Sequence, residues 1–541
     1  MAKPGLRSMS WRRLAGSWPG LVACLLIGAW YAVSRGQDAS WDLRNYHLYN
    51  AWALLHGRLG IDLAPASLQG YFNPLLDLPY YLLGTGSLRQ MPRLLAACQG
   101  LWFGGVVWVV GRIVARLAAL QHRPFGLIDA AVWLLGVSGS MTLSQAGLSS
   151  NEMPLALLVL GALYLLLPSV GDERVSWRRV AGAGLLCGLA AGLKPTAIVY
   201  VPGLALALLV MCGVRRPAWS LAAVFSAAAA SGFALAYGWW GWRLYQLTGN
   251  PVFPLFNQVF HSPWVPAASG TDPRFLPHGI LQWLGYPFYW LVATQSLVTE
   301  VRFADPRYAL ALASVVALMV AGVRGARRGA PVQPQVRLIA LFVGLSYVAW
   351  LVLFSILRYA IPIEVLSGVL MLMAWQAWMP SLRTTTPSAP GRSALVMLCI
   401  AAAAATHVPQ WGHTRYAGVV FSVRVPTVEP GSLVVVLGQP NAYVIPFIPD
   451  AISARFVGIT WLTRQAAGRV LGERVRNAVT AHRGLLYALL RDDASDDLAT
   501  LQRWLPGRSL QACVPVESAM ERTRGGTDVS FGLRLCRVEP R

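Results

Sequence analysis

The sequence is poor in charged residues, and acidic residues are the scarcest. Only 13% of its 541 residues are charged, and Asp and Glu together number 23. Soluble proteins average about 25% charged residues, whereas 55% of this chain is hydrophobic. This balance excludes a soluble enzyme and a disordered chain, and seven cysteines in so long a chain exclude a small disulfide-rich protein. The composition indicates a polytopic membrane protein.

Lysine is almost absent, and so are several well-known catalytic motifs. Lys3 and Lys194 are the only lysines, and arginine supplies the rest of a formal net charge of +22. The arginines fall in short clusters between apolar runs, without interleaved aromatic residues, so we expect no nucleic-acid partner.

The sequence contains no Walker-type loop, G-x-S-x-G elbow or H-E-x-x-H motif. ATP-driven transport, serine hydrolysis and zinc proteolysis therefore lack support.

Long apolar runs dominate the first three quarters of the chain. An apolar stretch of roughly 17–25 residues can cross a bilayer as a helix. About eleven candidates are present, and the short pair around Lys194-Pro195 can also be interpreted as one kinked element. They lie near 18–34, 91–111, 125–141, 153–168, 180–193, 195–213, 218–242, 306–323, 338–356, 359–380 and 393–410. The predicted fold class is an α-helical polytopic membrane protein.

The distribution of basic residues predicts the orientation in the membrane. Six short segments would share a side with the N-terminus: 1–17, 112–124, 169–179, 214–217, 324–337 and 381–392. They hold 18 of the 45 Lys and Arg residues but only two acids, Asp172 and Glu173. The positive-inside rule places them in the cytoplasm, so an odd number of spans places the C-terminus outside. We interpret the chain as a multi-pass protein of a bacterial inner membrane, with an uncleaved N-terminal anchor.

Two loops and the C-terminal tail face outward under this topology. The loops cover 35–90 and 243–305 and belong to a transmembrane domain, 1–410. The tail, 411–541, carries 27 of the 68 charged residues of the chain. Buried strands are predicted at 433–437 and 485–490, and helices near 464–480 and 495–505. The tail is therefore predicted to be a small extracytoplasmic α/β domain.

Two cysteines, Cys513 and Cys536, lie in this external domain. Oxidising conditions outside the cytoplasm permit a disulfide between them. Two separate buried thiols are the alternative, and no C-x-x-C or Cys/His metal pattern is present.

The first external loop contains an acidic residue at the start of an amphipathic stretch. The sequence from Trp41 to Asn50 reads WDLRNYHLYN. It predicts a helix that begins just after Asp42 and lies in the membrane interface. Asp42 could be the N-cap of this helix. Alternatively, Asp42 is a general base or a metal ligand at the membrane surface, where lipid-linked substrates present their headgroups.

A second acid, Glu152, stands at the predicted outer start of a later span, in the sequence SNEMPLA. A solvated carboxylate favoured by the helix dipole is one interpretation. The other is a second acid that converges with Asp42 on one site.

A lysine within the membrane region is the third feature. Lys194 follows a glycine-rich apolar run and precedes Pro195. In a chain where almost every other basic residue is arginine, this lysine suggests a role that arginine fills poorly. Its compact ammonium group suits a phosphate oxygen. Snorkelling to lipid headgroups is the alternative.

The fourth feature is the sequence LRYAIPIE, from Leu357 to Glu364, at the predicted outer end of a late span. Arg358 offers a rigid fork for phosphate. Arg358 and Glu364 could instead pair with other side chains. Together, the four features supply the groups needed to deprotonate an acceptor and to neutralise a phosphate leaving group.

The second external loop adds weaker candidates. Glu300 and Asp305 are candidate substrate contacts, with surface ion pairs as the alternative. His47, His261 and Asn73 are candidate neighbours of the site because they lie on the same predicted side of the membrane.

The order of these motifs resembles the GT-C superfamily of integral-membrane glycosyltransferases, which use polyprenyl-phosphate-linked sugars, as do the dolichyl-phosphate-mannose–protein mannosyltransferases. The matching elements are Asp42 with Tyr46 and the helix end at Gly57, Glu152-Met153-Pro154-Leu155, the run Gly188–Pro195, and Arg358-Tyr359 with Pro362. The resemblance covers roughly 1–410. It departs from the family pattern at Leu43, where a second acid is usual.

The resemblance implies a base role for Asp42, support of the acceptor or of a metal by Glu152, and phosphate contacts from Lys194 and Arg358. The candidate catalytic residues are thus Asp42 and Glu152. The candidate substrate-binding residues are Arg44, Tyr46, His47, Asn50, Asn73, Lys194, Glu300, Arg358 and Tyr359. No cofactor is required by this scheme. A divalent metal ion stays open, although Leu43 counts against one.

The predicted function is transfer of a sugar from a polyprenyl-phosphate donor to an extracytoplasmic acceptor, which could be a glycan, a lipid or a protein. Membrane lipids are the other expected partners. A transporter or flippase of lipid-linked glycans is the alternative from another class, and it predicts polar residues that track through the membrane. A glycan polymerase or ligase is a third possibility with a similar layout.

Overall fold

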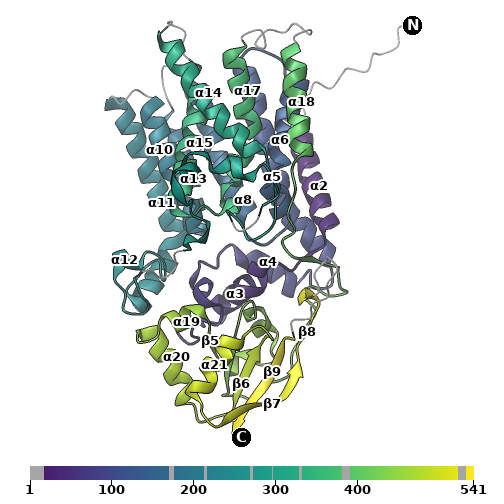
Figure 1. Cartoon of the computed structure of the whole chain (residues 1–541), viewed down its shortest axis with the longest axis vertical. Helices are drawn as coiled ribbons and strands as arrows, with labels where there is room; N and C mark the ends of the chain where they lie inside the picture. Colours follow the sequence, from purple (N-terminus) through teal and green to yellow (C-terminus); the bar gives the residue numbers. More distant parts are fainter. Residues whose placement is uncertain are drawn as a thin grey trace, which may run out of the picture.

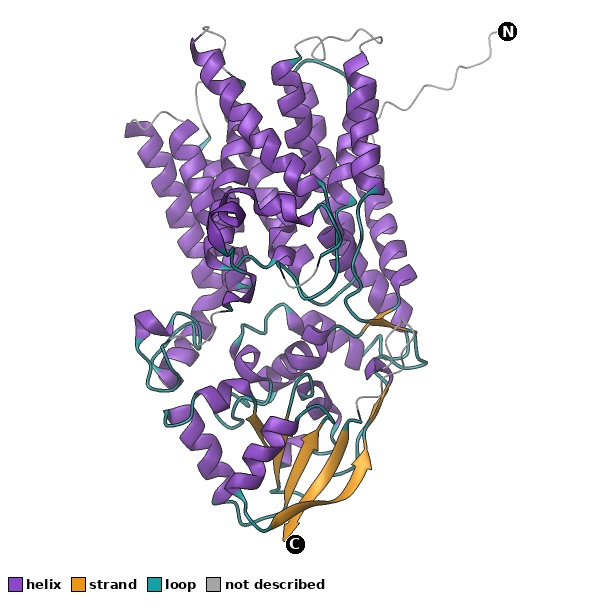
Figure 2. Ribbon diagram, viewed as in Figure 1, coloured by secondary structure: helices purple, strands orange, loops and turns teal. Residues whose placement is uncertain are grey.

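The computed structural model describes residues 18–169, 176–211, 216–267, 272–294, 297–327, 332–379, 390–521 and 532–540. A bundle of long helices forms one end of the molecule, and a smaller mixed α/β layer forms the other (Figures 1 and 2). The predicted fold class, a helical membrane-type bundle with a small C-terminal α/β domain, is confirmed. Much of the chain predicted to face the cytoplasm lies outside the described residues.

Helices occupy all eleven predicted apolar stretches. They are α2 (Trp18–Arg35), α5 (Pro92–Leu120), α6 (Leu127–Val137), α7 (Ser140–Gln145), α8 (Glu152–Leu166), α9 (Trp177–Leu193), α10 (Tyr200–Met211), α11 (Arg216–Thr248), α14 (Arg307–Arg327), α15 (Pro334–Leu353), α16 (Ile361–Glu364), α17 (Ser367–Trp378) and α18 (Pro390–Ala404). The sequence establishes their positions well, because each run is almost continuously apolar.

Fewer helices than predicted are individually long enough to span a membrane. Within the described ranges, four helices pass by length and composition: Pro92–Leu120, Ala218–Thr248, Arg307–Gly325 and Pro334–Leu353. A bent pair, Leu357–Glu364 with Ser367–Trp378, makes a fifth if its two halves are one span. The bend of 45° lies at a break where the helix restarts. Four other apolar helices have only 10–17 residues, because breaks interrupt the apolar runs.

Small residues bring the bundle helices together. Along α9, Gly188 and Gly192 face the backbone of α11, where a Cβ atom at Gly188 would overlap the carbonyl oxygen of Ala229. Close helix approach through small residues is typical of membrane bundles. The glycine-rich run therefore fixes α9 against α11, and so fixes the position of Lys194 at the end of α9.

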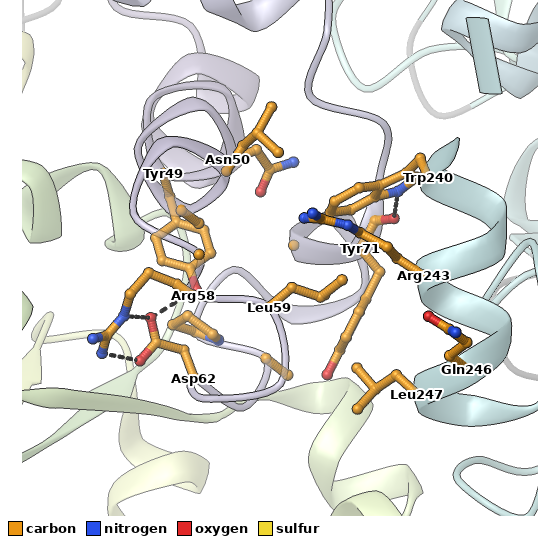
Figure 3. A pocket seen from close by; sticks show the side chains of 16 residues that line it. Tyr49, Asn50, Arg58, Leu59, Asp62, Tyr71, Trp240, Arg243, Gln246 and Leu247 are labelled. Carbon is orange, nitrogen blue, oxygen red and sulfur yellow. Dashed lines mark hydrogen bonds and ion pairs between the residues drawn. The ribbon is translucent and has the colours of Figure 1, made fainter. Parts of the chain in front are cut away.

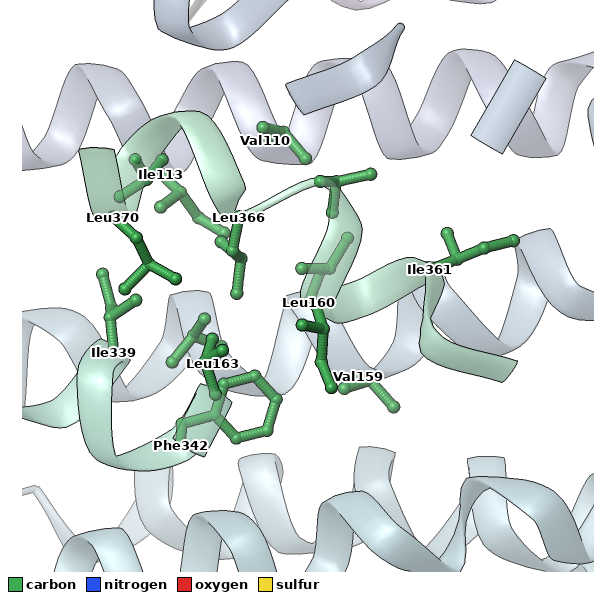
Figure 4. Packing of buried hydrophobic residues seen from close by; sticks show 14 of the residues in the cluster. Val110, Ile113, Val159, Leu160, Leu163, Ile339, Phe342, Ile361, Leu366 and Leu370 are labelled. Carbon is green, nitrogen blue, oxygen red and sulfur yellow. The ribbon is translucent and has the colours of Figure 1, made fainter. Parts of the chain in front are cut away.

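The centre of the bundle is a packed apolar core (Figure 4). It joins α5, α8, α15, α16 and α17 through branched and aromatic side chains. Those labelled in the figure are Val110, Ile113, Val159, Leu160, Leu163, Ile339, Phe342, Ile361, Leu366 and Leu370. This core holds the ends of α8 and α16, which carry two of the predicted motifs, in fixed positions.

The C-terminal domain contains a five-stranded sheet in the order β5-β4-β6-β9-β7. The strands are β4 (Leu433–Leu437), β5 (Arg455–Ile459), β6 (Leu486–Leu490), β7 (Arg508–Pro515) and β9 (Arg534–Pro540). β4 is parallel to both β5 and β6, whereas β9 is antiparallel to β6 and to β7. The two predicted strands correspond to β4 and β6. Cys513 of β7 and Cys536 of β9 form a disulfide.

The helices of this domain are α19 (Trp461–Gln465), α20 (Val470–Thr480) and α21 (Ser495–Trp504). The single helix predicted near 464–480 is thus divided in two. Gly468 lies between the two parts with a φ of +73°, a left-handed conformation that suits glycine and ends a helix.

Both faces of the sheet are buried, as a nearly continuous apolar strand predicts. In β4, Leu433 and Val435 pack in the cluster that contains Leu471 of α20. Val434 and Val436 alternate to the other face and pack in the cluster that contains Leu43 and Tyr49. The first loop, predicted to be external, therefore supplies one of the two layers that cover the sheet of the C-terminal domain.

The helix predicted to lie in the membrane interface is buried between two parts of the protein. It comprises a π-helical segment, η1 (Leu43–His47), and α3 (Leu48–Leu55), and it lies between the bundle and the sheet (Figure 1). Tyr49 and Trp52 are only 4% and 3% exposed. The amphipathic pattern was correct, but its apolar side packs on protein rather than on lipid.

The loop and the tail also meet through backbone contacts. Strand β1 (Gln37–Asp38) pairs with β2 (His413–Thr414), and Leu63 forms a bridge with Val457 of β5. The second loop joins them, because Leu471 of α20 donates its backbone N–H to the carbonyl of Trp264 over 3.1 Å. The first loop, the tail and the part of the second loop around Trp264 thus lie at one end of the bundle, whereas Trp290 and Phe303 of the second loop pack into the bundle core.

A substitution at Gly458 tests the contact between β5 and the first loop. A Cβ atom at this position would overlap the carbonyl oxygen of Ala64 in the first loop. We expect Gly458→Ala to lower the free energy of unfolding by about 1–3 kcal/mol, the usual effect of overpacking. Gly418→Ala is the matched control, because a Cβ there meets nothing within 4 Å, and its effect should stay within about 0.5 kcal/mol. Denaturant unfolding of the purified variants measures both, and equal values would contradict the predicted close contact.

Candidate active site

Asp42 forms a buried ion pair with Arg358. The Asp42 side chain is on the first turn of the helix that continues through η1, and its Oδ2 lies 3.0 Å from Nη1 of Arg358. Arg358 belongs to a short 3₁₀ segment, η7 (Leu357–Ala360), between α15 and α16. Asp42 has helical dihedral angles and its side chain accepts no capping hydrogen bond. The N-cap interpretation is therefore wrong, because the helix already includes Asp42 and its carboxylate faces an arginine.

Lys194 and Glu152 form a second ion pair. Lys194 precedes Pro195, which disfavours a helical conformation at the preceding residue. Lys194 is accordingly extended, with φ −146° and ψ 118°, and α9 ends there. Its Nζ lies 2.5 Å from Oε1 of Glu152 and donates to the carbonyl of Ser150 over 2.9 Å. Glu152 begins α8 but is only 4% exposed, so the solvated-carboxylate interpretation is wrong and the lysine does not point away to headgroups.

The ring of Tyr359 lies near both cations. Nζ of Lys194 is 5.4 Å from the ring centroid, and Cζ of Arg358 is 5.5 Å from it. Arg358 also lies 5.3 Å from the ring of Trp411, at the start of the C-terminal tail. Attraction between a cation and an aromatic face favours these arrangements. Four motifs that are far apart in the sequence therefore meet in one cluster, composed of Asp42, Glu152, Lys194, Arg358 and Tyr359.

A second group of polar side chains supports η1. Nδ1 of His47 lies 2.6 Å from Oδ1 of Asp77, which also accepts a hydrogen bond of 2.8 Å from the amide of Asn151. Asn151 directly precedes Glu152, so Asp77 connects the helix of Asp42 with the start of α8. The ring of Tyr46 lies beside that of His47, tilted by 40°, with centroids 4.0 Å apart.

The charges around Asp42 keep its carboxyl group ionised. Burial alone raises the pKa of Asp42, but the positive charges of Arg358 and Lys194 outweigh burial and hold this pKa below its ordinary value of 3.8. Tyr46 shows the opposite behaviour, because burial and the negative charge of Asp42 raise the pKa of its phenol well above the ordinary 10.0. At neutral pH the site therefore combines a carboxylate with a neutral phenol that can donate a hydrogen bond.

Six predicted substrate-binding residues lie outside the five-residue cluster: Tyr46 and His47, described above, and four others. Arg44 pairs with Glu521 of the C-terminal domain over 3.0 Å. The amide of Asn73 donates to the carbonyls of Gly192 and Ala236, each over 2.9 Å, and so joins α9 to α11. Glu300 is exposed in the second loop, where its charge acts on Arg358 and Arg274. Asn50 lines a separate cavity.

Two further acids are buried rather than at the surface. Asp305 forms an ion pair with Arg307 over 2.8 Å, and neither side chain is exposed. The expectation of a surface ion pair for Asp305 is therefore wrong. Glu364 is fully buried and accepts hydrogen bonds from the hydroxyl of Tyr308 and from the backbone of Met141 and Thr142. Both carboxylates thus hold α7 against neighbouring helices.

The described residues do not match a metal site. No group of three or more His, Cys, Asp and Glu side chains among them is placed to hold a metal ion. In the cluster, Asp42 and Glu152 each face a cation, which competes with a metal for their oxygens. Position 43, where the resemblance would supply another acid, is a buried leucine.

Two cavities lie near these elements. The larger, about 360 Å³, is bounded by α3, the chain after it and the end of α11 (Figure 3). The smaller, about 230 Å³, lies where β4 and β6 end, beside Trp461 and Arg464. Neither cavity is lined by the five-residue cluster.

Sequence reasoning did not identify Asp77 or Asn151. The first loop contains four acids, Asp38, Asp42, Asp62 and Asp77, and every one of them is buried. Acids in a predicted external loop are usually solvated, so their burial could be found only from the tertiary structure. Asn151 was within the Glu152 motif, but nothing in the sequence indicated its partner.

No protein-family model and no curated protein matches this sequence. Among solved structures, the cryo-EM structure of the arabinofuranosyltransferase AftD from mycobacteria is similar, with 16% identity and a TM-score of 0.48. The match covers 97% of this chain and 40% of that one, so this chain spans about two fifths of the length of the solved protein. A likeness at this level identifies neither a family nor an activity.

Proposed function

We propose that this chain is a membrane glycosyltransferase that moves a sugar from a polyprenyl-phosphate donor to an acceptor outside the cytoplasm. The observation that carries the proposal is the meeting of Asp42, Glu152, Lys194, Arg358 and Tyr359 in one cluster. A carboxylate base and two cations are what this reaction needs, since a hydroxyl must lose its proton while a phosphate leaves.

Four side chains of the cluster have a role in the proposed reaction. Asp42 accepts the proton of the acceptor hydroxyl as its oxygen forms a bond to the anomeric carbon of the sugar. The bond from that carbon to the phosphate oxygen breaks, and its electrons leave with the polyprenyl phosphate. Lys194 and Arg358 neutralise the leaving phosphate. Attack opposite the leaving group inverts the anomeric centre. Glu152 holds the ammonium group of Lys194, and no step requires a metal.

The ion pairs explain how the site can remain buried without its substrate. Each phosphate-binding cation is paired with a carboxylate, so neither charge is isolated in a low-dielectric region. A phosphate that takes the place of Asp42 on Arg358 would release this carboxylate next to the reacting hydroxyl. Binding of the donor would thus prepare the base.

Native mass spectrometry of gently extracted protein tests the donor assignment. We expect wild type to retain a polyprenyl phosphate or its sugar conjugate, with the conjugate enriched in Asp42→Asn, because that variant binds the donor without completing the transfer. Ordinary phospholipid alone in both proteins would contradict the donor assignment and favour a transporter instead.

The pH dependence of transfer tests the role of Asp42 as base. Because Arg358 and Lys194 lower the pKa of Asp42, its carboxylate is available down to low pH, and kcat/KM should show no loss from this group between pH 8 and about 5. Arg358→Gln removes a cation and should move the acidic limb to higher pH. A limb that stays in place in this variant would contradict the assignment.

The lowered pKa of Asp42 also makes the stability of the fold depend on pH. The pKa of Asp42 is lower in the folded protein than its unfolded-state value of about 3.9, so the ionised carboxylate stabilises the fold at pH values above about 3.9. This stabilisation is lost as the pH falls through the folded-state pKa.

A further inference from the structure

The 360 Å³ cavity beside α3 has the side chains of a sugar-binding site. Trp240 of α11 and Tyr71 of the first loop form its aromatic part, and the indole nitrogen of Trp240 donates to the Tyr71 carbonyl over 2.9 Å. Both residues are only 4% exposed, so their rings are held rigidly. Arg243 and Gln246, on the same helix, add exposed polar groups at the rim.

One buried acceptor in this cavity has no partner. Asn50 is 3% exposed, and its amide nitrogen donates to the carbonyl of Gln69 over 2.9 Å. Its Oδ1 makes no hydrogen bond among the described residues. Figure 3 shows this amide oxygen pointing toward the cavity. A buried acceptor without a donor is unfavourable by about 1–3 kcal/mol, and a ligand hydroxyl would satisfy it.

The charges of the cavity favour a neutral ligand over a phosphate. Arg58 and Asp62 are both in the wall, but their side chains are paired with each other at 2.6 Å and neutralise one another. Arg243 is the one remaining cation in the wall, and it lies 6.0 Å from the ring of Trp239. Aromatic side chains in the wall together with a few fixed hydrogen-bonding groups suit a sugar ring, which has both apolar C–H faces and hydroxyls.

We propose that this cavity binds a sugar ring of the acceptor, which is therefore a glycan. Assignment to the acceptor rests on the function proposed above. Asn50 follows Asp42 by eight residues in one continuous helix, a distance of about 12 Å along its axis. None of the five cluster residues lines the cavity, so a sugar held there is not the one attached to the reacting phosphate. A chain of a few sugar units spans the distance between Asn50 and Asp42.

A photo-crosslinking amino acid at Gln246 tests this inference in the full chain, in the membranes of its own cells. The control places the same amino acid at Tyr245, which is adjacent in sequence but 50% exposed on another face of α11. After illumination, we expect an adduct at position 246 that releases monosaccharides on hydrolysis, at least tenfold more than at position 245. Asn50→Ala should reduce it about fivefold to tenfold, the effect of one hydrogen bond.

Several outcomes would overturn the assignment. An adduct that carries fatty acyl chains or peptide, equal adducts at both positions, or no adduct would contradict a sugar site. A sugar released by mild acid together with polyprenyl phosphate would identify the donor and contradict the acceptor assignment. Adding Asp42→Asn separates the two proposals: the adduct should persist while transfer stops. If transfer persists instead, the proposed mechanism fails although the sugar site stands.

Discussion

Asp42→Asn should reduce the rate of sugar transfer by about 10²–10⁴-fold, the usual contribution of a general base. Asparagine has nearly the same shape but cannot accept a proton at neutral pH. The donor phosphate still finds Arg358 and Lys194, so the loss should appear mainly in kcat, with a smaller change in KM. The measurement is transfer by purified protein in lipid vesicles, per folded molecule.

The loss of an ion pair needs its own control. Asp129 is fully buried and pairs with Arg123 over 2.6 Å, at the start of α6. Asp129→Asn should therefore affect folding in a similar way but leave transfer per folded molecule unchanged. Equal loss of transfer in the two variants would show that Asp42 is needed only for the fold.

The pair of Lys194 and Glu152 should show a large effect on stability that can be separated from function. Lys194→Met leaves the buried carboxylate of Glu152 without a counter-ion, and Glu152→Gln leaves the ammonium group of Lys194 without one. Each single variant should lose about 3–5 kcal/mol of unfolding free energy, whereas the double variant should regain most of it, because no isolated charge remains. Detergent-induced unfolding measures these differences.

Sugar transfer should stay low in the double variant, although its stability recovers. The double variant lacks the ammonium group proposed to neutralise the leaving phosphate, so we expect it to remain at least about 10²-fold below wild type, the size of a lost transition-state contact. A double variant that is both stable and active would restrict Lys194 and Glu152 to a structural role.

The sequence located most of the helices but only part of the site. Apolar runs identify a helix wherever it lies, and β-branched runs such as Leu433–Leu437 identify a strand buried on both faces. The order of the motifs identified Asp42, Glu152, Lys194 and Arg358 as candidate site residues. Their partners could not be predicted, because each ion pair joins segments more than forty residues apart. The N-cap interpretation of Asp42 failed for this reason.

By itself, the sequence determined the class of protein and the residue types available for chemistry. Low charge, long apolar runs and one lysine at a helix-breaking proline are local properties, readable from composition and spacing. Only the tertiary structure decided that the helix from Asp42 to Leu55 packs on the sheet of the C-terminal domain instead of on lipid. An amphipathic helix buries its apolar face equally well in either environment, and the choice depends on which distant surface offers a complementary apolar face.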